Sequence, residues 1–139
     1  MPAFTSGGQI PASQSPFQAN LIGDVDFTIG AEGSNAIIVS AQLKTPDGRA
    51  LTQAGIVEVY LATAATGATL PTAPSGAVAI ATKGTILVAM TAKLYLKVKS
   101  HTDGIFDISI TEAGAYTVYM IVVFPDGSIK ASGAITFAA

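Results

Sequence analysis

The stretch IIVSAQLKTPDG, Ile37–Gly48, alternates apolar and polar side chains and then runs into a turn signal. Every second residue of its first part is apolar: Ile37, Val39, Ala41 and Leu43. Successive side chains of a β-strand point to opposite faces, so this alternation predicts a strand with one face in a core. Proline presets a turn dihedral and glycine supplies a positive φ, so Pro46-Asp47-Gly48 predicts a tight turn.

The same alternation recurs along the chain, in Val57–Leu61, Leu94–Val98, Phe106–Ile110 and Ile129–Phe137. The run Tyr116–Phe124 is apolar at nearly every position, which predicts a central strand or a strand whose outer face is covered by a partner. A second Pro-Asp-Gly signal follows this run. We find no segment with helical periodicity. The sequence therefore predicts an all-β protein, an antiparallel β-sandwich of about seven or eight strands.

Two connections are less regular. Thr102-Asp103-Gly104 stands between two alternating stretches and predicts a tight hairpin. The segment Ala62–Ala79 is rich in Ala and Thr and contains Pro71 and Pro74. This composition predicts a long loop or a weak edge strand.

The chain divides into an N-terminal arm, residues 1–23, and a β-sandwich domain, residues 24–139. The arm carries no charge and contains three prolines, which block both helices and strand ladders, so we expect it to be extended. Its spaced apolar residues could anchor it to a partner: Phe4, Ile10, Phe17, Leu21 and Ile22. A floppy tail is the alternative. We favour an arm that orders when it docks on a neighbouring subunit.

Composition excludes several classes of protein. The 139 residues include no Cys, so a disulfide scaffold is impossible. The single His also argues against a structural zinc site. The net charge is −2, which argues against a strongly basic nucleic-acid binder. Only 12% of residues are charged, against about 25% in typical domains, which indicates that much of the surface faces other protein. The longest apolar run is about half the length of a membrane helix, and Met1–Asn20 lacks the pattern of a secretory signal.

Catalytic and metal-binding patterns are weak. Ser100, His101 and Asp103 are close in sequence, but neighbouring strand residues point to opposite faces, so we expect a solvated turn histidine rather than a triad. Asp24 and Asp26 would share one face of a strand, and two carboxylates alone favour solvated charges over a metal site. The chain has no phosphate-binding glycine motif. We expect no enzymatic activity, no metal and no cofactor.

One candidate interaction face emerges, because basic and aromatic residues alternate along a single predicted strand: Lys93, Tyr95, Lys97 and Lys99. Three interpretations remain open. Such a face could stack bases and neutralise phosphates. Its lysines could instead protect a sheet from edge-to-edge aggregation. It could also contact an acidic protein surface.

The body resembles a known family in the sequence pattern of its strands and turns. The residues that carry the resemblance are Ile38–Lys44 with Pro46-Asp47-Gly48, Ala54–Leu61, Gly104–Ile110, Tyr119–Gly127 and Ser132–Phe137. They are similar to bacterial immunoglobulin-like domains of the invasin type, and more narrowly to Ig-like structural proteins of tailed bacteriophages. The resemblance implies an Ig-like β-sandwich without catalytic residues.

For function, the resemblance implies a capsid decoration or cement protein, located on the virion surface and assembled in the host cytoplasm. The arm would grip the major capsid protein or a neighbouring copy, and a dimer or trimer is expected. A tail-tube, baseplate or fibre location is one alternative. A carbohydrate- or receptor-binding module is another, although the chain has no Trp and its tyrosines are spread over different predicted strands. We expect neither nucleic acid nor membrane as a partner.

Overall fold

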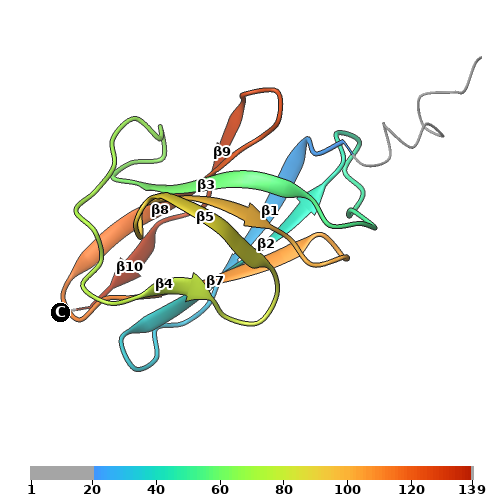
Figure 1. Ribbon diagram of the computed structural model, residues 1–139. Coiled ribbons are helices and arrows are strands. Elements are labelled where there is room, and N and C mark those ends of the chain that lie inside the picture. Colours follow the sequence, from blue (N-terminus) through green and yellow to red (C-terminus); the bar gives the residue numbers. More distant parts are fainter. Residues whose placement is uncertain (1–20, 139) are drawn as a thin grey trace, which may run out of the picture.

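Two antiparallel sheets pack face to face in the computed structural model, which describes residues 21–138 (Figure 1). One sheet has the order β1-β2-β7-β4, and the other has the order β10-β8-β3-β6-β5, with β9 also paired to β8. The strands are β1 (Asp24–Ile29), β2 (Ala36–Lys44), β3 (Ile56–Ala62), β4 (Val78–Ile80), β5 (Thr85–Thr91), β6 (Tyr95–Lys99), β7 (Ile105–Thr111), β8 (Tyr116–Val123), β9 (Ile129–Ala131) and β10 (Ile135–Phe137). Nowhere in this range is there a helix that could cross a membrane.

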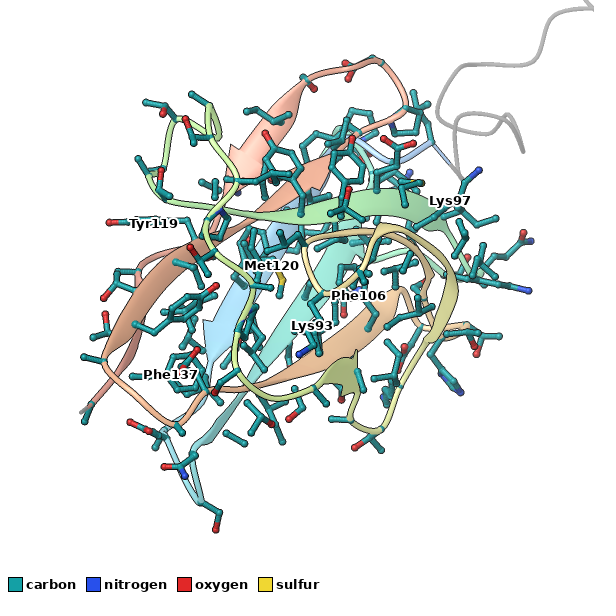
Figure 2. All side chains as sticks on the ribbon, turned by 60° about the vertical axis from the view of Figure 1, so that its left-hand side comes forward. Lys93, Lys97, Phe106, Tyr119, Met120 and Phe137 are labelled. Atoms are coloured by element: carbon teal, nitrogen blue, oxygen red, sulfur yellow. The ribbon has the colours of Figure 1, made fainter. Side chains whose placement is uncertain are left out.

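The predicted alternation decides which face of each sheet is buried. In β2, the residues at every second position are buried, from Ile37 to Leu43. The same holds for Val57–Leu61 in β3 and Phe106–Ile110 in β7. Burying each such side chain contributes roughly 1.5–3 kcal/mol. The core between the sheets is therefore built from the very stretches that predicted the strands, and Figure 2 shows Phe106 and Met120 within it.

Strand β8 is central, as its continuous apolar run predicted. It pairs with β3 on one side and with β9 and β10 on the other. Val118, Met120 and Val122 enter the core, while Ile121 is fully buried although it lies outside the core cluster. The register places Tyr60 and Ala131 beside Ile121. The outer face of β8 is thus covered by the protein itself at this point.

The strand order is that of an immunoglobulin-type sandwich with three further strands, β5, β6 and β9. Sheets of constant-type domains have the orders A-B-E-D and G-F-C. Here β1-β2-β7-β4 and β10-β8-β3 reproduce both orders in the same chain sequence. The hairpin β5–β6 comes between β4 and β7 in the chain and extends the second sheet beyond β3. The expected Ig-like β-sandwich is confirmed, with ten strands rather than seven or eight.

Two of the additional strands show where the pattern was misleading. Strand β5 was not predicted, because Ile86–Met90 is a continuous apolar run without alternation, and most of its side chains are exposed. The stretch Ile129–Phe137, predicted as one strand, is divided into β9 and β10. On the facing strand β8, Ile121 pairs with Ala131 of β9 and Val118 pairs with Ile135 of β10. The segment from Ala131 to Ile135 is therefore one residue longer than the facing segment of β8. This β-bulge moves Ile129 from the core face to the surface.

The turns form where they were predicted, but one of them connects different strands than expected. Gly48 and Gly127 have φ values of 91° and 89°, as the two Pro-Asp-Gly signals require. At the third signal, the Gly104 N–H donates to the His101 carbonyl and closes a tight turn. The prediction of a hairpin there is wrong, because β6 and β7 belong to different sheets. Turn residues specify a chain reversal and carry no information about which strands pair.

Asp107 fixes the loop that leads from β4 into β5. Its Oδ1 accepts hydrogen bonds from the backbone N–H groups of Thr82 and Lys83, at 2.7 and 2.8 Å. The backbone N–H of Asp107 also donates to the Lys83 carbonyl. Although it stands on the outer face of β7, Asp107 is buried beneath this loop. A position that alternation marks as solvent-facing therefore anchors the additional hairpin.

We expect Asp107→Ala to lower the free energy of unfolding by about 1–3 kcal/mol, because two partly buried N–H groups lose their acceptor. Asp107→Asn keeps an oxygen acceptor and should lose less. Urea unfolding of the full chain measures both differences. An alanine variant as stable as the parent would show that the loop is held by other contacts.

Candidate interaction surfaces

The predicted docking arm is only partly within the described residues. Phe4, Ile10 and Phe17 lie outside them. Leu21 is 42% exposed, whereas Ile22 is 7% exposed and belongs to the core cluster. Ile22 therefore packs into the sandwich of its own chain and is not free to grip a neighbour. The arm that could reach a partner ends before this residue.

Three of the four residues of the predicted basic face lie on the same side of one strand. Tyr95, Lys97 and Lys99 alternate with the buried Leu96 and Val98 along β6. Lys93 precedes the strand, in a turn where its φ is 66°. Its Nζ donates to the Pro74 carbonyl at 3.2 Å. Figure 2 shows Lys93 and Lys97 on separate parts of the molecule, so the two lysines do not form one patch.

The lysines of β6 do not protect a sheet edge. Strand β6 lies between β3 and β5, so its backbone groups are paired on both sides. That interpretation of the face is therefore wrong. Within residues 21–138, Lys97 and Lys99 form no ion pair. Their charges remain available to solvent or to an acidic partner.

Two tyrosines meet on the outer face of the same sheet. Tyr60 and Tyr95 are cross-strand neighbours whose rings stack at 5.1 Å with an interplanar angle of 4°. The Tyr95 hydroxyl donates to Glu58 at 2.8 Å, and the Tyr60 hydroxyl donates to the Gly67 carbonyl at 2.7 Å. The two tyrosines stand on different strands, as expected, and the strand register brings their rings together. One ring face and the hydroxyl of each are already engaged within the chain.

The hydrogen bond from Tyr95 to Glu58, together with burial, raises the pKa of the Tyr95 phenol to about 12. The carboxylate accepts the phenolic proton in a hydrogen bond, so it stabilises the neutral form. A second negative charge beside Glu58 would also be repelled. Tyr95 is consequently a neutral, hydrogen-bonded part of this surface.

Strand β5 forms the most apolar edge of the described structure. Thr85–Thr91 contains no charged residue and no proline. Its exposed large side chains are Leu87, Val88 and Met90, which we call the β5 edge surface. Shifts in register against β6 break the alternation, so the consecutive residues Leu87 and Val88 are both exposed. One side of this strand has no strand neighbour within residues 21–138.

The other sheet edges carry the features that normally prevent aggregation. Charged side chains and short strands make an edge a poor template for pairing. Strand β1 carries Asp24 and Asp26, and β9 carries Lys130. Strands β4, β9 and β10 are each three residues long. Only β5 is a long and uncharged edge among the described strands, which distinguishes it as a contact surface.

An open groove of about 360 Å³ lies near the beginning of β3. The residues that line it are Ile56, Val57, Glu58, Lys97, Val123, Phe124, Pro125 and Gly127. Its apolar side comes from β3, from the end of β8 and from the second Pro-Asp-Gly turn. Its two charged residues, Glu58 and Lys97, are cross-strand neighbours. This groove was not predicted, because its walls are far apart in the sequence.

The two aspartates of β1 are ion-paired with lysines. Asp24 contacts Lys130 at 2.8 Å, and Asp26 contacts Lys44 at 2.5 Å. The hydrogen bond from Lys130 lowers the pKa of the Asp24 carboxyl. Since Lys130 stands on β9, this pair links the edges of the two sheets. The part of the chain that the structure describes holds no group of three residues suited to a metal ion.

Ser100, His101 and Asp103 do not form a relay. The buried Ser100 hydroxyl donates to the His101 carbonyl and accepts from the Gly55 N–H. The His101 imidazole is more than half exposed and lies 3.4 Å from Asp103. The hydroxyl is therefore bonded to backbone groups rather than to the imidazole. The histidine is a solvated turn residue, as expected from the sequence.

No family model, no curated protein and no solved structure matches the chain.

We expect Glu58→Gln to lower the pKa of Tyr95 from about 12 towards 10, because the negative acceptor is removed. In the parent chain, the unfolded phenol ionises first. The raised pKa of Tyr95 therefore adds to the free energy of unfolding, and this contribution is complete below pH 10. The contribution is lost as the pH rises to about 12. NMR titration of the tyrosine ring carbons measures the shift. A parent Tyr95 that titrates near pH 10 would contradict the assignment.

Proposed function

We propose that this protein is a non-enzymatic structural component of a bacteriophage virion, a decoration protein that binds the outside of the capsid shell. It associates with copies of itself and attaches through its N-terminal arm. Binding across the joints of an assembled shell would stabilise the shell by mass action. The proposal joins the resemblance to phage Ig-like proteins with the surfaces described above.

The β5 edge surface is the observation that carries the proposal. Exposed apolar edges with unpaired backbone groups are avoided in proteins that remain monomeric. Here Leu87, Val88 and Met90 stand on an uncharged strand, whereas the other edges are short or charged. An edge of this kind fits a permanent contact with another protein. Because β5 carries no charge, two copies can meet there without electrostatic repulsion.

The arm supplies the second contact. Residues 1–20 carry no charge and include Phe4 and Ile10, two large apolar residues that stand well before the first strand in the sequence. Leu21, the first residue of the described range, is exposed, so the chain leaves the sandwich at its surface. Apolar anchors on such a segment suit insertion between subunits of a shell.

We expect Val88→Lys to reduce the native mass to that of a monomer, because a charge at the centre of the β5 edge surface would be buried without a partner. Ile38→Lys is the matched control, since Ile38 and Val88 are 45% and 47% exposed and Ile38 lies on the other sheet. Light scattering of both variants measures the mass. A Val88→Lys protein with the parent mass would exclude this edge from self-association.

Deletion of residues 1–20 should abolish binding to undecorated heads of the phage that encodes the chain, while the sandwich stays folded. The truncation keeps Ile22, because this residue belongs to the core. Co-sedimentation measures the binding, and circular dichroism monitors the fold. Saturable binding of the parent with none by the truncated chain is the expected pair of results. Equal binding by both would contradict the role of the arm.

A further inference from the structure

The groove at the beginning of β3 leaves apolar surface unfilled. Ile56 is 47% exposed there, a large value for a branched apolar side chain on a strand. Val123 and Pro125 form further walls, and the nearly buried Phe124 lies at the base of the turn. Concave sites lined mainly by apolar side chains are where ligands and partner groups bind.

The chain enters the sandwich beside this groove. Ile22 packs against Gly55, because a Cβ atom added to Gly55 would lie 2.8 Å from the Ile22 Cδ1. Gly55 directly precedes Ile56, the exposed wall of the groove. Leu21 is exposed next to this contact. The residues that precede Leu21 therefore begin within a few residues' reach of the groove.

We propose that Phe17 of the same chain occupies the groove. Phe17 precedes Leu21 by four residues, a span of about 13 Å when extended. Between them, Gln18, Ala19 and Asn20 carry no charge. The ring would cover Ile56, Val123 and Pro125.

The charged rim also fits an aromatic occupant. The exposed Lys97 lines the groove and has no ion-pair partner within residues 21–138. An ammonium group over an aromatic face is favourable. The adjacent Glu58 accepts a hydrogen bond from Tyr95 and forms no ion pair with this lysine within residues 21–138.

Docking at Phe17 divides the arm into two parts. Residues 16–20 become a fixed base on the sandwich, and the part that carries Phe4 and Ile10 projects from a defined point. A fixed base reduces the conformational entropy that the arm loses when it binds a partner. The inference does not depend on the proposed function, because the contact lies within one chain.

The test replaces Phe17 by the photoreactive p-benzoylphenylalanine in the full chain. After irradiation, mass spectrometry should locate cross-links at Ile56 or in 123–127. A mixture of isotope-labelled and unlabelled protein should give cross-links within single chains only. Ile56→Lys should lower the yield about tenfold, which corresponds to a loss of about 1.4 kcal/mol in docking. Ile38→Lys, with the same change at a similarly exposed residue of the other sheet, should leave the yield unchanged.

Cross-links to other segments, cross-links between chains or no cross-links would each overturn the inference. An unchanged yield in Ile56→Lys would overturn it as well. Head binding by the parent chain is measured separately. A failed cross-link with intact head binding would thus remove the docking of Phe17 and leave the proposed function standing.

Discussion

The contact between the two sheets is the interaction on which the rest of the structure depends. Val39 and Ile108 are register partners in one sheet, Val59 and Val122 are register partners in the other, and all four are almost completely excluded from water. These four residues stand on inner strands, so the core lies between the central parts of the two sheets. The β5 edge surface and the groove are both positioned by this central packing.

The hairpin β5–β6 connects the fold to the proposed function. The seven-strand order of an immunoglobulin-type sandwich is complete without it. Its strands nevertheless bring the β5 edge surface, the exposed lysines of β6 and one wall of the groove into the molecule. Asp107, on the opposite sheet, holds the loop that leads into this hairpin. The additional hairpin thus carries the exposed features to which the proposed function assigns the contact with other subunits.

Local pattern was sufficient where one face of a strand is buried and the other is wet. Stretches such as Ile37–Leu43 show this directly, because burial alternates with the side chains. The pattern failed where that condition fails. Leu87–Met90 is exposed at every position, and the β-bulge between β9 and β10 turns Ile129 towards the surface. The Tyr60–Tyr95 stack and the groove depend on register between distant strands, which no local stretch encodes.

The central claim is that the β5 edge becomes covered when the protein assembles. Hydrogen–deuterium exchange of the head-bound protein, compared with dilute free protein, tests it most directly. The account predicts slower exchange for Thr85–Thr91 on assembly, with little change in the charged edge strand β1. Unchanged exchange in β5 together with protection elsewhere would contradict the account and place the assembly contact on another surface.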